Sequence, residues 1–243
     1  MFRFSGILVI SLLLTACSGS SSVLKGIEEV AGQVLAESGG GLSTADIAAG
    51  LKQALAIGSQ NVVGQLGRAD GFNTDPIAHI PLPNGLVKVR NVMRKVGLSG
   101  QLDSLETRLN RAAEQATPKA KELFLSAINR MTIDDAVGIL RGPDDAATQF
   151  FRGAMGVALA SAMRPIIDDS LSQVGAVRSF NSLLSSYRQI PLVPPVEADL
   201  TEHVLDAGVD GIFHYIAEEE KAIRDNPVKR TTELLRRVFG AAS

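Results

Sequence analysis

The segment TPKAKELFLSAINRMTIDDAVGIL, residues 117–140, contains the pattern that decides the fold. Thr117 precedes Pro118, which suits an N-cap followed by a proline at the first helical position. Apolar residues then recur at three- and four-residue steps, as on one buried helix face: Ala120, Phe124, Ala127, Ile128 and Met131. Thr132, with Asp135 three residues later, repeats the capping signal and begins a second helix. This segment therefore predicts two successive helices with no strand between them.

The same periodicity extends in both directions along the chain. It predicts helices over about 23–36, 43–66, 86–96, 102–116, 144–163, 165–174, 176–188, 199–224 and 227–239. Pro165 is expected to break or kink the helix that contains it. Residues 67–85 and 190–195 are rich in turn and proline signals and predict irregular segments. We therefore expect an all-α fold, a single compact bundle of about nine or ten helices over residues 42–240.

Composition and charge exclude several classes of protein. The chain has 243 residues, of which 45% are hydrophobic, and this is enough apolar chain to rule out a disordered protein. Its formal net charge of −2 argues against a dedicated nucleic-acid-binding protein, which would carry a basic excess. The single cysteine excludes an internal disulfide and a zinc site with several thiolate ligands.

The N-terminus has the features of a cleaved export signal. Arg3 precedes an apolar run over residues 6–14, which is too short for a membrane-spanning helix of about 20 residues. Leu14-Thr15-Ala16-Cys17 resembles the bacterial lipoprotein signal, in which the cysteine is acylated and becomes the new N-terminus. We therefore expect a signal peptide at 1–16, a palmitate-bearing lipid anchor at Cys17 and a flexible tether with a short helix at 17–41. In the sorting rule of enterobacterial lipoproteins, an Asp directly after the cysteine retains the protein in the inner membrane. Ser18 occupies that position here, so we expect the outer membrane, at its periplasmic face.

Several short stretches carry a family resemblance. They include residues 46–55 (DIAAGLKQAL), 80–83 (IPLP), 110–114 (NRAAE), 118–121 (PKAK), 131–136 (MTIDDA), 142–148 (GPDDAAT), 174–176 (VGA), 211–213 (GIF) and 218–227 (EEEKAIRDNP). Together they resemble the bacterial lipoproteins of the domain-of-unknown-function 4197 family. The resemblance covers about residues 42–240 and implies an envelope location and a single domain, but it implies no activity, substrate or catalytic residue.

Two pairs of acidic residues are the only candidates for chemistry that the sequence offers. Asp134 and Asp135, and ten residues later Asp144 and Asp145, each fall in the first turn of an expected helix. They could share a divalent cation, as in a metal-assisted hydrolase. The favoured interpretation is that they cap the two helices, because acidic side chains accept hydrogen bonds from free N–H groups there. The three histidines have no metal-ligand spacing, and the serines form no nucleophile motif.

The C-terminal region presents a run of basic residues, namely Arg224, Lys229, Arg230, Arg236 and Arg237. They could form a face that meets anionic lipid headgroups or an acidic partner. They could also be ordinary solvated helix surface, with side-chain pairs such as Glu220–Arg224 at four-residue spacing. The sequence favours the solvated helix surface.

The functional expectation follows from the anchor and from the missing catalytic motifs. We expect a non-enzymatic module that binds the bilayer through acylated Cys17 and binds an envelope protein or an apolar ligand, but no nucleic acid. The apolar, proline-containing segments at 80–83 and 190–195 could line a groove or could simply cover the core. No cofactor is expected under this hypothesis. The alternative hydrolase would need a divalent cation held by the four aspartates.

Overall fold

The computed structural model describes residues 43–95, 100–190, 195–196, 198–226 and 236, and all regular structure in these ranges is helical. The helices are α2 (Thr44–Leu66), α3 (Asn84–Lys95), α4 (Gly100–Ala116), α5 (Ala120–Arg130), α6 (Ile133–Arg141), α7 (Ala146–Gln173), α8 (Ala176–Arg188) and α9 (Leu200–Asp225), with the 3-10 turn η1 (Thr117–Lys119) before α5. The expected all-α bundle is confirmed. Cys17, the tether and the helices expected at 23–36 and 227–239 lie outside the described residues, apart from helical Arg236.

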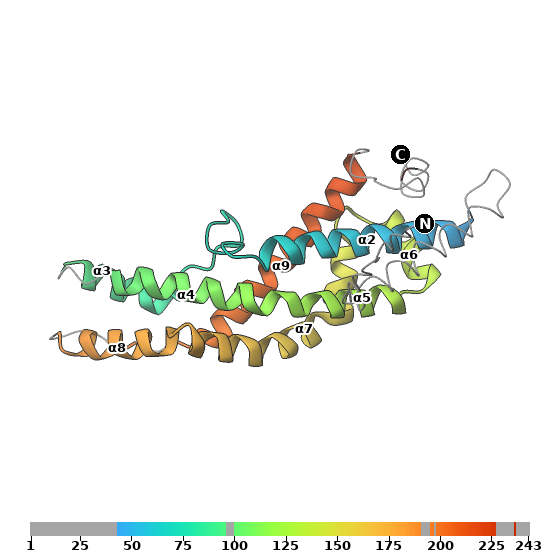
Figure 1. The fold of residues 1–243 in the computed structure, drawn as a ribbon. Helices are drawn as coiled ribbons and strands as arrows, with labels where there is room; N and C mark the ends of the chain where they lie inside the picture. The colour runs from blue at the N-terminus through green and yellow to red at the C-terminus, as the bar shows by residue number, and fades with distance from the viewer. Residues whose placement is uncertain (1–42, 96–99, 191–194, 197, 227–235, 237–243) are drawn as a thin grey trace, which may run out of the picture.

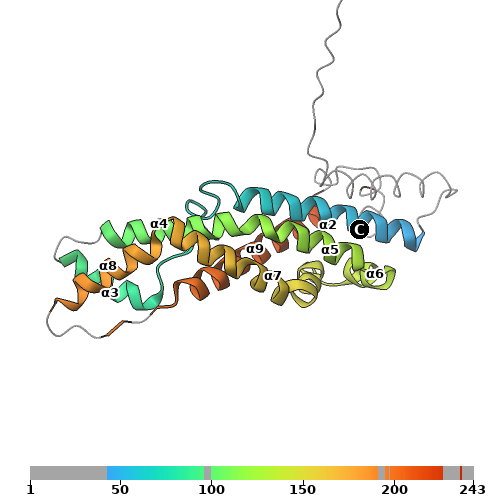
Figure 2. The ribbon, with the colours of Figure 1, turned by 60° about the horizontal axis from the view of Figure 1, so that its bottom comes forward.

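The helices form an elongated bundle (Figures 1 and 2). Helix α7 packs along α9, and α4 packs on both. Helix α2 contacts α9, α5 and α6. Both views place α3, the start of α4 and α8 at one end of the bundle. The N-terminal end of α2, α5 and α6 occupy the opposite end. The long irregular segment between α2 and α3 projects beside the middle of α9.

Local capping chemistry explains where two helices begin. Ser43 and Asp46 form a capping box at the start of α2, with hydrogen bonds in both directions between side chain and backbone. Thr132 and Asp135 form the same box at the start of α6. Both helix starts were predicted from the sequence, because a capping box depends only on residues four apart or closer.

The expectation that a helix ends near residue 163 is wrong. Helix α7 continues through Pro165 to Gln173. Pro165 removes one backbone N–H, but it lies on the exposed side of the helix, where water can hydrate the freed carbonyl. Met163 and Ile167, on either side of it, are fully buried. Packing on both sides of the proline therefore keeps the two halves in one helix.

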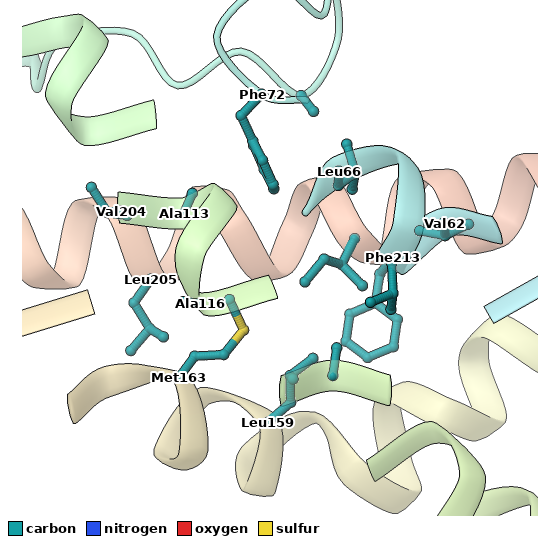
Figure 3. Close-up of a cluster of buried hydrophobic side chains, with 14 of the residues drawn as sticks. Val62, Leu66, Phe72, Ala113, Ala116, Leu159, Met163, Val204, Leu205 and Phe213 are labelled. Carbon is teal, nitrogen blue, oxygen red and sulfur yellow. The ribbon is translucent and has the colours of Figure 1, made fainter. Parts of the chain in front are cut away.

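One hydrophobic core runs through the bundle. The rings of Phe124 and Phe151 meet edge to face at a centroid distance of 5.1 Å, and Phe124 and Phe213 do so at 6.1 Å. Figure 3 shows Phe213 of α9 beside residues of α2, α4 and α7, with Phe72 reaching down from the irregular segment. Ala113 and Ala116 supply small, fully buried positions on α4. Small side chains there allow α4 to approach α7 and α9 closely.

The apolar segment at 80–83 covers the core. Ile80 and Leu82 are almost fully buried, so their side chains are not available to line an open groove. Residues 191–194 of the second such segment lie outside the described residues. Within the part of the chain that the structure describes, no helix has both the length and the apolar character needed to cross a bilayer.

Candidate functional site

The structure places the four candidate aspartates at the two ends of α6. Asp134 and Asp135 lie in its first turn, whereas Asp144 and Asp145 follow its last residue. A helix of nine residues is about 13 Å long, so the two pairs are not brought together. No group of three or more His, Cys, Asp or Glu side chains in the described ranges is placed to hold a metal ion. This geometry gives no support to a metal-assisted hydrolase built from these residues.

Asp135 and Asp145 act differently as capping residues. The backbone N–H and the hydroxyl of Thr132 donate to Asp135, which lowers the pKa of its carboxyl below the ordinary value. Asp145 stands at the N-cap of α7, yet its side chain caps no N–H group and instead accepts from Gln149. The interpretation of Asp145 as a side-chain cap of α7 is therefore wrong. A different carboxylate accepts hydrogen bonds from the first N–H groups of α7.

That carboxylate is Glu220 of α9. Its two oxygens accept from the backbone N–H groups of Ala147 and Thr148, each at 2.9 Å, and from the Thr148 hydroxyl at 3.0 Å. Glu220 is only 5% exposed and is paired with Arg224 at 3.0 Å. A buried negative charge at the N-terminal end of α7 complements its helix dipole. Glu220 thus fixes α7 to α9.

Arg224 belongs to the same buried network. Its guanidinium donates to the carbonyl oxygens of Ile139 and Leu140, at the C-terminal end of α6. The pair Glu220–Arg224 was predicted and is formed, but it is buried between helices and is not solvated surface. Among the other basic candidates, Arg236 is exposed, and Lys229, Arg230 and Arg237 lie outside the described residues.

Residues 67–83, which we call the α2–α3 loop, are held in place by polar side chains of α4. Glu114 accepts from the backbone N–H groups of Phe72 and Asn73. Asn110 accepts from the N–H of Ile80 and donates to the carbonyl oxygen of the same residue. Both α4 side chains are almost fully buried. Because these bonds satisfy buried backbone groups, they fix a non-helical segment firmly against the bundle.

A third α4 residue, Glu106, extends this arrangement. Its carboxylate contacts His79 Nε2 at 2.8 Å and Arg90 of α3 at 3.2 Å. The other ring nitrogen of His79 faces the carbonyl oxygen of Asn73 at 2.9 Å. Glu106, Asn110 and Glu114 therefore form one polar row at four-residue spacing, and each holds a different part of the α2–α3 loop.

Helix α9 holds the other side of the loop. The Tyr215 hydroxyl donates to both oxygens of Asp75, each at 2.7 Å, and His203 Nε2 contacts the carbonyl oxygen of Pro81 at 2.7 Å. Gly211 lets the loop approach closely, because a Cβ atom there would lie 3.1 Å from the Phe72 ring and 3.3 Å from Ala78. The loop is thus clamped between α4 and α9.

The clamp shifts two ionisation equilibria. Burial alone would raise the pKa of Asp75, but hydrogen bonds from Ala78, Tyr215 and Ile77, with nearby His214, bring it below the ordinary value. Burial, together with the hydrogen bond to Asp75 and its charge, raises the pKa of Tyr215 to about 12. Over a wide pH range Asp75 therefore stays ionised and the Tyr215 hydroxyl stays protonated, so the hydrogen bond between them is kept.

An open groove of about 550 Å³, which we call the loop groove, lies where the α2–α3 loop meets α7 and α9. The loop contributes its turn at 77–79, and α9 contributes one face from Ala207 to Ala217. Thr148 and Arg152 of α7 and its N-cap residue Asp145 complete the lining. Ile77, on the loop, is 57% exposed. The groove therefore combines an exposed aliphatic side chain with a few fixed polar groups.

Two of these polar groups stand out. Arg152 pairs with Asp210 at 3.0 Å, and its guanidinium lies 4.6 Å from the centre of the Phe213 ring. His214 packs edge to face against Tyr215, and its Nε2 atom is buried without a hydrogen-bond partner in the described part of the chain. The sequence had given no reason to group Ile77, Arg152 and Asp210, since they come from three separate segments.

The comparison with known families supports the resemblance seen in the sequence. The family model DUF4197, described as a protein of unknown function, matches residues 41–240, so the chain belongs to this family. No curated protein and no solved structure matches the chain significantly. The family thus brings no activity with it, and the function has to be argued from the site.

Proposed function

We propose that this member of the DUF4197 family is a lipid-anchored binding module of the bacterial envelope. In this proposal acylated Cys17 holds the helical bundle at the periplasmic face of the outer membrane, and the loop groove receives a segment of an envelope protein. The anchor is supported by the apolar run at 6–14 and by the small residues that precede Cys17. The binding role of the groove is supported by its volume of about 550 Å³ and by the exposed side chain of Ile77.

The observation that carries the binding role is the exposure of Ile77 on a loop that is otherwise fixed. An exposed loop tip normally carries polar residues and moves freely. Here Asp75 accepts from the backbone N–H groups of Ile77 and Ala78 at 2.9 and 2.8 Å, so the turn that presents Ile77 is rigid. A rigid apolar side chain loses little conformational entropy when a partner covers it.

The rest of the groove suits a polypeptide segment. It is open to solvent, so it can admit a chain that enters on one side and leaves on the other. Arg152 is kept in position by Asp210 and Phe213, which makes it a preorganised donor for a carbonyl oxygen or a carboxylate. Apolar contact at Ile77 and polar contact at Arg152 would together fix the orientation of the bound segment.

Site-specific photocrosslinking in envelopes tests the binding role. A photoreactive residue is placed at position 145, which lines the groove from a different segment than Ile77. We expect one discrete crosslinked product, which is lost when Ile77→Asp is added. The matched control is Val157→Asp, since Val157 is 85% exposed on α7 and does not line the groove. Absence of a product, or a product equally sensitive to both substitutions, would contradict the proposal.

The anchor is tested separately by metabolic labelling with a palmitate analogue. Cys17→Ala removes the only thiol in the chain, so we expect it to abolish labelling and to release the protein from the membrane fraction or leave it unprocessed. Labelling that persists in this variant would refute acylation at Cys17. The result leaves the groove experiment unaffected, because residue 17 is far from the groove in sequence and the two experiments use different readouts.

A further inference from the structure

The end of the bundle formed by α3, the first half of α4 and α8 is strongly basic. Residues 84–95, 100–108 and 176–188 contain seven Lys and Arg residues and two carboxylates. The cations are Lys88, Arg90, Arg94, Lys95, Arg108, Arg178 and Arg188, and the acids are Asp103 and Glu106. Both ribbon views show these three helices together at one end (Figures 1 and 2). A chain with a net charge of −2 therefore carries a concentrated positive field there.

A pocket of about 450 Å³ opens between α4 and α8 in this basic end. Its lining consists of Gly100, Gln101, Ser104, Arg178, Ser179 and Ser182, so it offers an amide, three hydroxyls and a guanidinium and contains no carboxylate. Glu106, one of the two nearby acids, is already engaged by His79 and Arg90. The pocket thus presents hydrogen-bond donors in a positive field.

Part of the hydrogen-bonding capacity of this pocket is already used, because the Ser104 hydroxyl accepts from Arg108 Nε at 3.4 Å, but other donors have no partner among the described residues. Ser185 and Ser186, further along α8, each donate to the carbonyl oxygen four residues earlier, as serines in helices commonly do. The hydroxyls of Ser179 and Ser182 donate to no described residue. Arg178 forms no ion pair within the described ranges. The hydroxyls of Ser179 and Ser182 and the guanidinium of Arg178 share the pocket, where they are placed to bind a ligand.

We propose that this pocket binds the phosphoryl group of an anionic molecule. A phosphoryl group presents several acceptor oxygens, and a guanidinium with neighbouring hydroxyls matches them in charge and geometry. The other cations at this end of the bundle raise the local concentration of anions. This site is separate from the loop groove: the two share no lining residue. Free phosphate and a phospholipid headgroup offer the same chemistry, so the test has one arm for each.

The first arm measures inorganic phosphate binding by amide chemical shifts. The chain is used from residue 17 with Cys17→Ala, so that neither the apolar run at 6–14 nor an acyl group interferes. We expect phosphate to shift amides at 100–104 and 178–182. Arg178→Gln should weaken binding by at least about tenfold, and Ser182→Ala by about threefold to tenfold. Both side chains are exposed and unbonded in the described structure, so the fold should be retained, which circular dichroism can verify.

The second arm measures cosedimentation with vesicles of phosphatidylglycerol, compared with vesicles of zwitterionic phosphatidylcholine. The matched control in both arms is Arg130→Gln, which removes the same charge from the end of α5, at the far end of the bundle. A response to phosphate that depends on Arg178 supports the pocket with free phosphate as a sufficient ligand. Arg178-dependent binding to phosphatidylglycerol vesicles alone supports the pocket with a lipid headgroup as the source. No response in either arm, or equal effects of Arg178→Gln and Arg130→Gln, overturns the proposal.

Discussion

Replacement of Glu220 by glutamine should destabilise the bundle, because the Glu220 carboxylate joins α9 to the start of α7. Glu220→Gln exchanges one carboxylate oxygen for an NH2 group and keeps the size of the side chain. The wild-type carboxylate accepts three hydrogen bonds from Ala147 and Thr148 and pairs with Arg224. In the variant one acceptor remains, and the new NH2 group faces a donor at the start of α7.

The magnitude follows from the groups that lose their partner. At least one buried N–H of α7 is left without an acceptor, which costs about 1–3 kcal/mol. The N-terminal end of α7 also loses its compensating charge, which contributes up to about 2 kcal/mol in a partly buried site. Arg224, whose side chain is 13% exposed, loses its ion pair with Glu220. A total of about 3 kcal/mol agrees with the cost of about 3–5 kcal/mol for breaking a buried ion pair.

Urea unfolding followed by circular dichroism measures this loss directly. In thermal unfolding, the same loss of about 3 kcal/mol should lower the Tm of a chain of this size by about 6–12 °C. Glu218→Gln is the matched control, because Glu218 lies two residues away on the exposed side of α9 and should change stability by less than about 0.5 kcal/mol. If Glu220→Gln is no less stable than Glu218→Gln, the carboxylate does not hold α7 to α9 as described.

Three further outcomes follow from the clamp on the α2–α3 loop. Gly211→Ala should cost about 1–3 kcal/mol in urea unfolding, since its Cβ would meet the Phe72 ring at 3.1 Å, whereas Gly64→Ala, with open space around it, should be neutral or stabilising. Tyr215 should ionise only near pH 12 in an absorbance titration; because its folded pKa is raised from 10.0, its contribution to stability is complete below about pH 10 and is lost as the pH rises toward 12. The pKa of Asp75 is lowered from 3.8, so its contribution is present above about pH 4 and is lost as the pH falls through the lower folded value; Asp75→Asn should therefore flatten the acid side of the stability profile, and an unchanged acid slope would contradict this.

The clamp itself left only a weak signal in the sequence. Asn110 and Glu114 occur among the apolar positions of α4, where a buried polar residue costs free energy unless it is hydrogen-bonded. Together with Glu106 they have the spacing of one helix face, so the row could have been noticed before the structure was known. Its partners could not have been identified, because they are backbone and side-chain groups that lie 16 to 42 residues away in the chain.

The basic candidates show the same limitation. Sequence reading selected the cations that follow one another at the C-terminus, since charge runs are visible only along the chain. The basic end of the bundle is instead assembled from Arg178 of α8 and the cations of α3, about 85 residues apart. The fold places these helices at the same end of the bundle (Figures 1 and 2), and no local sequence pattern records that.

The sequence by itself determined the helical class of the fold and the starts of α2 and α6, while the lipid anchor that it predicts at Cys17 stays a prediction. These depend on side chains within a few residues of one another, through hydrogen bonds in a capping box or the periodicity of one helix face. Only the tertiary structure decided that α7 continues through Pro165, that Glu220 caps α7, and that Ile77 stands at a groove. Each of these depends on contacts between segments distant in the chain, where packing outweighs local preference.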